Sequence, residues 1–477
     1  MTLALLPKLL EHLLCLQCHG ATLELQGGGA DLVCSRCNAE FPALGRVPAV
    51  VHQPKRQRET WQAQQSGMVF TLGQALSKIE HDLKRFDLLP KTRSRLECLR
   101  AGIRKNQKGL VQLFKEAGLP LDADPPSRNP SEAPVPLTEH YQLLLRDWGW
   151  PKTKENERAA AQVLASFGAR ARVERMAVLG AGGGRLTYDL HRALKPALSV
   201  AIDNNPLLLL AADQVLGGGK LALQEFPLVP NTLADCAVER MLQLPGPVPN
   251  GLHVLLADAL LPPLRAGAFD FILTPWFIDV VGEDIRDQVA LIHNLLPVGG
   301  VWLNHGPLIH RGGQQPRMRY VADEVWELVE RGGFELTCVE QQTCEHLVGP
   351  STGQARLETV HTFAAVKRPL HAVDDEQDPP NWVLLPHVPV PNFHGLAGFK
   401  RATEHQGREQ GPAQHPTIQR AVHLIDEQRS VDNIAAVLLS EGLLPANVAP
   451  LEAVSAILLS VYTSCRQQHD EHRDSSS

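Results

Sequence analysis

The sequence of 477 residues lacks any apolar run of the roughly 18 to 20 residues that a membrane-spanning helix requires. Its amino terminus is rich in leucine, but Lys8, Glu11 and His12 interrupt the run, and neither a basic start nor a small-residue cleavage site frames it. These absences argue against a signal peptide and a membrane anchor. We therefore expect a soluble protein, with the cytoplasm as its location.

The sequence also has few aromatic residues, 5% of the total, and no excess of positive charge, since its formal net charge is -6. A chain of this charge gives no general reason to expect nucleic acid or an anionic membrane as a partner. Residues 52–116 are a local exception, with fourteen Lys and Arg against six Asp and Glu. Such a stretch is more typical of a solvated helical face than of a binding surface.

Length and composition indicate several domains. A chain of 477 residues, 44% hydrophobic and 21% charged, exceeds one ordinary hydrophobic core, so two to four domains are expected. Patterning and proline content predict a metal-binding module at 1–52, a helical lead-in and proline-rich linker at 53–136, an α/β domain at 137–368, a linker at 369–416, and a small helical domain, loosely similar to a winged helix, at 417–467.

Four of the nine cysteines form two C-x-x-C pairs near the amino terminus. Cys15 and Cys18 are separated from Cys34 and Cys37 by fifteen residues, and a module of this size has too small a core to fold well without a staple. The spacing predicts a closed, tetrahedral zinc site of structural type. A disulfide pair and a redox C-x-x-C are the alternatives, disfavoured because no secretion signal is evident and because two matched pairs are present.

A glycine-rich loop follows an apolar strand that begins at Met176. Gly180, Gly182 and Gly184 form a G-x-G-x-G pattern that leads into a helix, and the next strand ends at Asp203. Glycines let the backbone approach a ligand, and an acid at the next strand end can bind ribose hydroxyls. Arg185 replaces the glycine of a dinucleotide fingerprint, so the pattern suits a cofactor without a pyrophosphate, such as S-adenosylmethionine. A purely structural turn is the alternative.

A third strand at 252–256 is followed by Asp258, a position that approaches the adenine ring in folds of this kind. A plain helix cap is nearly as good an interpretation of this residue.

Two further strand ends carry an acid and a histidine. The apolar stretch 269–277 predicts a buried strand with Asp279 just beyond it, and after a helix a strand at 301–304 leads to His310. Open α/β sheets bind ligands beyond the carboxyl ends of their strands, so both residues are candidates for substrate contacts and catalysis. Taken singly, a strand-end Asp is more often a turn residue and a lone His is usually structural.

Two resemblances add to this interpretation. The segment 34–51, with Phe41, Pro42, Gly45 and Pro48 after the second cysteine pair, resembles the zinc ribbon of the small methyltransferase-activator proteins. Residues 137–368 resemble the carnosine N-methyltransferase family through five segments, Arg146–Trp148, Gly180–Leu186, Asp203, Thr274–Asp279 and Gly299–His310.

The second resemblance implies a class I Rossmann-like methyltransferase fold, α/β in class, and methyl transfer from S-adenosylmethionine to an imidazole nitrogen of a histidine-containing dipeptide. By motif match, cofactor contacts are implied for Arg146, Gly180, Asp203 and Asp258, and substrate contacts for Asp279 and His310. The sequence departs from the family at Pro275-Trp276 and at 360–363, where the family has a tyrosine-rich strand. Carnosine itself is therefore not implied as the substrate.

The combined patterns predict an S-adenosylmethionine-dependent N-methyltransferase for a small histidine-containing compound or peptide. The alternatives are a non-catalytic scaffold that recruits protein partners through the ribbon and the carboxyl-terminal helices, and a protein or RNA methyltransferase. Retention of the glycines together with Asp203 and Asp279 favours the enzyme.

Overall fold

The computed structural model describes most of the chain. The described residues are 6–18, 22–27, 29–121, 137–150, 154–168, 172–282, 284–308, 315–351, 355–370, 380–393, 396–404, 415–444 and 449–474. The chain forms two compact units, Met1–Val281 with Leu295–Arg311 and Thr337–Ala364, and Gly282–Asn294 with Gly312–Leu336 and Ala365–Ser477.

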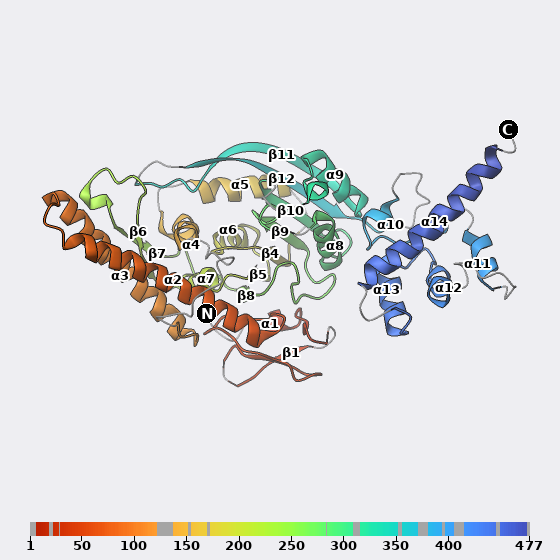
Figure 1. The fold of residues 1–477 in the computed structure, drawn as a ribbon, viewed down its shortest axis with the longest axis horizontal. Coiled ribbons are helices and arrows are strands. Elements are labelled where there is room, and N and C mark those ends of the chain that lie inside the picture. The colour runs from red at the N-terminus through yellow and green to blue at the C-terminus, as the bar shows by residue number, and fades with distance from the viewer. Residues whose placement is uncertain are drawn as a thin grey trace. The chain divides into compact units, whose positions relative to one another are not determined.

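A seven-stranded sheet forms the centre of the α/β domain (Figure 1). Its order is β11-β12-β10-β9-β4-β5-β8, and the pairs from β10 to β8 are parallel. The strands are β4 Arg175–Leu179, β5 Leu198–Asp203, β8 Leu252–Leu256, β9 Phe271–Pro275, β10 Val301–Gly306, β11 Phe334–His346 and β12 Arg356–Lys367. The chain runs outward from β4 through β5 to β8, and then returns to the other side of β4 with β9. The order therefore reverses between β4 and β9, which is where open α/β sheets bind their ligands.

Continuous apolar sequence explains the central strands. All five residues of β8 and of β9 are buried, as expected for parallel strands that are covered on both faces. Helix α5 Glu155–Phe167 precedes β4, and the helices between later strands are α6 Arg185–Leu194, α7 Pro206–Leu216, α8 Ile285–Leu295 and α9 Ala322–Arg331. In α8 the buried residues Ile285, Val289 and Ile292 follow the helical spacing that the sequence predicts.

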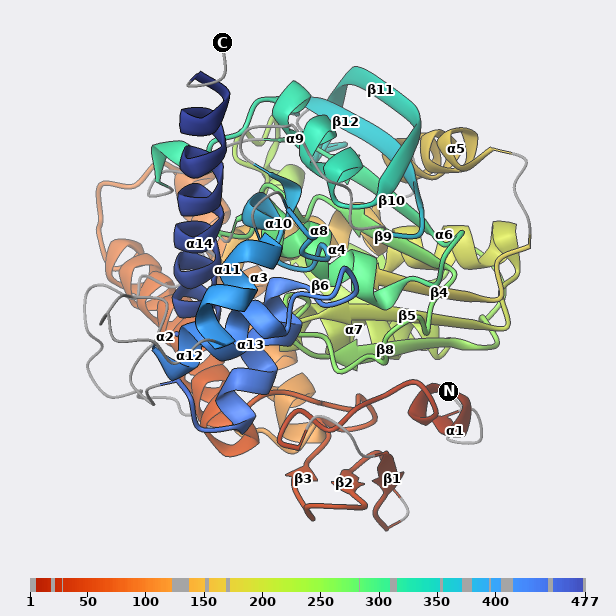
Figure 2. The same ribbon diagram turned by 90° about the vertical axis from the view of Figure 1, so that its right-hand side faces the viewer.

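The amino-terminal module extends this sheet. It contains helix α1 Leu6–Leu10 and a three-stranded sheet of β1 Leu23–Leu25, β2 Leu32–Cys34 and β3 Glu40–Phe41. The segment after β3 runs parallel to β8, because Leu256 N donates to Pro48 O at 2.9 Å and Val50 N donates to Leu256 O at 3.0 Å. Figure 2 shows the module at the β8 edge. Arg46 adds an ion pair of 2.8 Å to Asp213 on α7. The module is thus built into the edge of the central sheet.

Two long helices follow the module, α2 Pro54–Leu83 and α3 Pro90–Glu116, which pack against each other (Figure 1). The second helix also anchors an antiparallel strand pair, β6 Leu221–Glu225 and β7 Val238–Leu242. Asn106 on α3 exchanges two hydrogen bonds of 2.8 Å with the backbone of Gln224. Helix α4 Leu137–Leu144 then leads into a π-helical turn, η2 Leu145–Gly149.

The carboxyl-terminal part is helical, with α10 Asn381–Leu384, α11 Leu396–Glu404, α12 Pro416–His423, α13 Val431–Ser440 and α14 Pro450–Asp474. Helix α14 packs against α12 and α13, and the rings of Trp382, Phe393 and Tyr462 contact one another. Two observations differ from the sequence-based expectation. The expected linker 369–416 contains α10 and α11, because Trp382 and Leu396 are buried apolar anchors. The described part of 417–467 contains no strand, so it has no wing.

No helix within the described residues is both long and apolar enough to cross a lipid bilayer.

Candidate cofactor and substrate site

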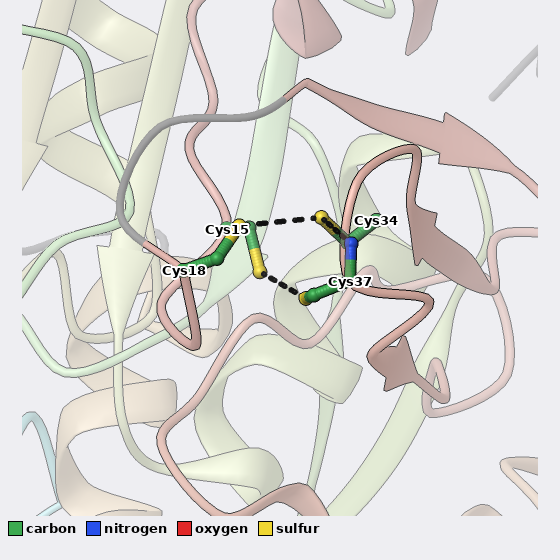
Figure 3. A group of neighbouring side chains, drawn as sticks. All are labelled: Cys15, Cys18, Cys34 and Cys37. Atoms are coloured by element: carbon green, nitrogen blue, oxygen red, sulfur yellow. Dashed lines mark hydrogen bonds between the residues drawn. The ribbon is translucent and has the colours of Figure 1, made fainter.

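The four cysteines of the amino-terminal module converge on one point (Figure 3). Their sulfur atoms all lie within 4.8 Å of one another, with Cys15 Sγ 3.7 Å from Cys37 Sγ and Cys18 Sγ 3.6 Å from Cys34 Sγ. Four thiolates about 2.3 Å from a tetrahedral zinc ion are separated by about 3.8 Å, so this arrangement fits that ion. The backbone amide of Cys37 also donates to Cys34 Sγ at 3.4 Å. All four thiols are free, and a closed set of four leaves no open metal position for catalysis.

The glycine loop after β4 requires the conformations that only glycine adopts easily. Gly180, Gly182 and Gly184 have φ angles of +74°, +57° and +80°. A Cβ on Gly180 would lie 2.6 Å from Phe277 Cδ2, whereas one on Gly182 would meet no atom within 4 Å. Gly182 is therefore the position at which the backbone borders open space, and the loop can receive a ligand there.

Asp203, at the end of β5, holds this loop in place. One carboxylate oxygen accepts a hydrogen bond from Gly182 N at 2.8 Å, and the other accepts one from Asn205 N at 2.9 Å. Withdrawal from water raises the pKa of Asp203 to about 6, although the backbone amides oppose the shift. Each oxygen keeps further acceptor capacity, so the ionised carboxylate can also bind the two hydroxyls of a ribose.

The π-helical turn η2 packs against the glycine loop. Trp148 Nε1 donates to Gly183 O at 2.8 Å. Arg146 forms an ion pair of 2.7 Å with Asp147, whose carboxylate is almost completely buried. A Cβ on Gly183 would lie 2.4 Å from Asp147 Oδ2, so this glycine lies directly against the carboxylate. The sequence predicts Arg146 as a cofactor contact; its ion-pair partner Asp147 lies against the glycine loop, and the contact of Arg146 with a cofactor stays a prediction.

Asp258 follows β8 and is exposed. Its carboxylate accepts a hydrogen bond of 2.9 Å from Leu260 N, which is the arrangement of a turn cap. This geometry agrees with the capping interpretation of Asp258, and the role in adenine binding stays a prediction.

The end of β9 is strained. Trp276 has a φ of +49°, a conformation that costs a bulky residue of the order of 1 to 3 kcal/mol. Its amide donates to His305 O at 2.9 Å, and a Cβ on Gly306 would lie 2.8 Å from Trp276 Cα. Gly306 therefore makes room for the tryptophan backbone. Strained backbone that the surrounding structure enforces is common at functional sites.

Asp279 lies in the turn beyond Trp276 and is 8% exposed. It occupies the predicted position past the strand end. His310 belongs to 309–314, outside the described residues, and its role stays a prediction.

Sequence reasoning missed three buried polar residues near this strand end. His346, the last residue of β11, lies with Nδ1 2.9 Å from Glu155 Oε1 on α5 and stacks on the Trp276 ring with 3.9 Å between ring centroids. His305 on β10 lies 2.9 Å from Thr362 Oγ1. Burial, together with the charges of Arg146 and His346, lowers the pKa of His305 to about 4. No local motif identifies these residues, because their partners are distant in sequence.

The strand order, the glycine loop and the acid at the end of β5 define the class I Rossmann-like methyltransferase fold. The predicted fold class is thereby confirmed. Within this class the sequence is similar to the carnosine N-methyltransferase unmet of Drosophila melanogaster, with 24% identity over 273 residues. The match covers 47% of this chain and 58% of that protein, so the chain spans little more than half the length of its relative. No family model matches the sequence.

Solved structures give weaker likenesses. A chain from the complex between the Haloferax volcanii Trm112 methyltransferase activator and a methyltransferase has a TM-score of 0.33 and 14% identity, over 48% of this chain and 94% of that one. The Haemonchus contortus phosphoethanolamine N-methyltransferase 2 has a TM-score of 0.31 and 14% identity, over 49% of this chain and 57% of that one. The strand order, and not these likenesses, defines the fold.

Proposed function

We propose that this chain is an S-adenosylmethionine-dependent N-methyltransferase whose acceptor is a small histidine-containing compound or peptide. The observation that carries the proposal is the hydrogen bond from Gly182 N to the carboxylate of Asp203. It joins a glycine loop with positive φ angles to an acid at a strand end, at the point where the strand order of the sheet reverses. The similarity to a carnosine N-methyltransferase supports an imidazole nitrogen as the acceptor.

S-adenosylmethionine supplies an electrophilic methyl group on a sulfonium. Transfer is an in-line displacement, which requires a neutral lone pair aimed at the methyl group, so the protein mainly provides orientation and a suitable electrostatic environment. Gly180, Gly182, Gly184, Asp203 and Arg146 are the residues that would bind the cofactor. Asp279 would bind a substrate ammonium or an imidazole N–H, and this contact would fix which nitrogen points toward the cofactor. His310 is proposed as a second substrate contact that relays a proton.

The four cysteines are proposed to hold one structural zinc ion, which would staple the ribbon and supply no chemistry to the reaction. Metal analysis of the purified chain should find one zinc per molecule. The loss of that metal in Cys18→Ser would confirm its ligands, whereas a metal-free native chain would contradict the site.

Calorimetric titration with S-adenosylmethionine, followed by a methyl-transfer screen, tests the catalytic proposal. The screen should include imidazole dipeptides, free histidine and small peptides. Asp279→Asn should reduce turnover by at least about 100-fold, since it removes the charge that orients the acceptor, while cofactor affinity stays within about twofold. Asp270→Asn is the matched control, because Asp270 lies at the opposite end of the same strand, where it accepts a hydrogen bond from Arg175 N.

An absence of cofactor binding would refute the proposal and support the scaffold alternative. Cofactor binding together with turnover of a protein or RNA substrate only would refute the small acceptor.

A further inference from the structure

Glu155 and His346 form a buried acid–imidazole pair beside the proposed acceptor position. Glu155 is 9% exposed and His346 is 4% exposed, and His346 Nδ1 lies 2.9 Å from Glu155 Oε1. Glu155 Oε2 accepts a second hydrogen bond, from Val348 N at 3.4 Å. A carboxylate opposite Nδ1 places the imidazole proton on that nitrogen and leaves the lone pair on Nε2. The pair therefore presents an oriented proton acceptor.

The position of this pair links it to the cofactor loop. The His346 ring stacks on Trp276, with an interplanar angle of 20°, and Trp276 directly follows β9. The next residue, Phe277, contacts Gly180 of the glycine loop. The strained Trp276-Phe277 dipeptide thus lies between the loop and the imidazole. Open α/β sheets bind ligands beyond the carboxyl ends of their strands, at the point where the strand order reverses, and here that point lies between β4 and β9.

The charges around the pair keep it in the form that accepts a proton. Burial and the charge of Arg146 lower the pKa of His346, and the hydrogen bond to Glu155 opposes them. Burial by itself would raise the pKa of Glu155, but the hydrogen bond from His346 and the charge of Arg146 outweigh this effect and lower the pKa. Arg356 also lowers the pKa of His346, and His305 is a further titratable neighbour. Near neutral pH the imidazole is consequently neutral and the carboxylate is ionised.

A purely structural role would be to fasten the end of β11 to α5. An apolar contact serves that purpose without the desolvation cost of a buried carboxylate, which amounts to several kcal/mol. The strained φ of Trp276, which supports the imidazole face, adds a second cost at the same place. Two unfavourable features that meet at the proposed acceptor position are better explained by chemistry than by packing.

The geometry points to His346 as the residue that accepts the proton released on methyl transfer, with Glu155 as its positioning residue. This inference rests on the proposed function. The acceptor nitrogen uses its lone pair to form the new N–C bond, and the C–S bond electrons stay on sulfur as a neutral thioether. The methylated nitrogen group then carries a positive charge and releases its proton to Nε2 of His346. The imidazolium so formed is stabilised by the Glu155 carboxylate.

Three variants test the pair in the full-length chain. His346→Gln should lower kcat by about 100-fold or more, the usual contribution of a general base, with KM for S-adenosylmethionine within about twofold. Glu155→Gln keeps an acceptor opposite Nδ1 but removes the charge, so kcat should fall by about tenfold and the acidic limb of its pH profile should move. His191→Gln is the matched control, because His191 is a buried histidine of α6 that bonds Ser199 Oγ at 2.8 Å. This control should lose stability but keep kcat within about threefold.

Turnover by His346→Gln within threefold of the native chain, or an equal loss in His191→Gln, would overturn the inference. A measurement that does not depend on turnover distinguishes failure of this inference from failure of the proposed function. In nitrogen-15 NMR of the histidine side chains, His346 should carry its proton on Nδ1. Its Nε2 resonance should shift when S-adenosylhomocysteine and imidazole, the smallest compound with the proposed acceptor group, are added together. If the native chain methylates no nitrogen compound, the proposed function fails, and an unshifted Nε2 resonance then overturns the role of His346 as well.

Discussion

Alanine at Gly183 is expected to break the contact between the glycine loop and the π-helical turn beneath it. The added Cβ would lie 2.4 Å from Asp147 Oδ2, so one of the two atoms must move by about 1 Å to reach an ordinary contact distance. The Asp147 carboxylate cannot move freely, because it is buried and paired with Arg146 at 2.7 Å. Displacing one partner of a buried ion pair costs roughly 3 to 5 kcal/mol.

That cost is a large part of the roughly 5 to 15 kcal/mol that stabilises a domain. Urea-induced unfolding should therefore show a markedly lower midpoint for Gly183→Ala, and calorimetry should show at least about a 100-fold loss of affinity for S-adenosylmethionine. Gly182→Ala is the control. A Cβ there meets no atom within 4 Å, and the φ of +57° alone costs about 1 to 2 kcal/mol. A free energy of unfolding for Gly183→Ala within about 0.5 kcal/mol of the native value would refute the reasoning.

Three further predictions concern the metal, the pH and the strained tryptophan. Removing the proposed zinc ion with a chelator should lower the midpoint of thermal unfolding of the α/β domain, because the ribbon pairs with β8. A midpoint that does not depend on the chelator would contradict this coupling. Affinity for S-adenosylmethionine should fall as pH drops through about 6, since protonation of Asp203 removes an acceptor; Asp203→Asn should bind weakly at every pH, and a flat native profile would count against the ribose contact. Gly306→Ala should destabilise the chain by roughly 1 to 3 kcal/mol, measured by denaturant unfolding, because its Cβ would lie 2.8 Å from Trp276 Cα. A neutral variant would show that the strand end is not tightly packed.

The elements around the glycine loop could be predicted because their signals are local. Each of the strands β4, β5, β8 and β9 is a short apolar run, and the glycines directly follow β4. The length of each run and the residues that flank it indicate a buried strand. The position of Asp279 beyond β9 follows from the same pattern. The order of these elements along the chain indicates an α/β domain, and the class I Rossmann-like methyltransferase fold is implied by the resemblance to the carnosine N-methyltransferase family.

The remainder of the site depends on contacts between distant segments. Glu155 is the first residue of a helix and His346 is the last residue of a strand, and no local sequence pattern at either position predicts that the two side chains pair. The π-helical turn that places Asp147 under Gly183 depends on tertiary packing, as does the positive φ of Trp276. In the carboxyl-terminal part, the proline and charged residues around Trp382 are typical of a linker, so the sequence pattern did not predict helix α10, in which Trp382 is buried.

The pairing of Ala49 with Leu256 has a consequence for how the chain folds. These two residues are separated by most of the amino-terminal half of the chain, and closing so long a loop is entropically slow. The cysteine module is synthesised before β8 and has metal-ligating side chains of its own, so it can fold before the strand it pairs with exists. The segment around Ala49 cannot pair until β8 has been synthesised. Folding of the module and its docking on the sheet are thus separate steps, and the second requires β8 to be in place.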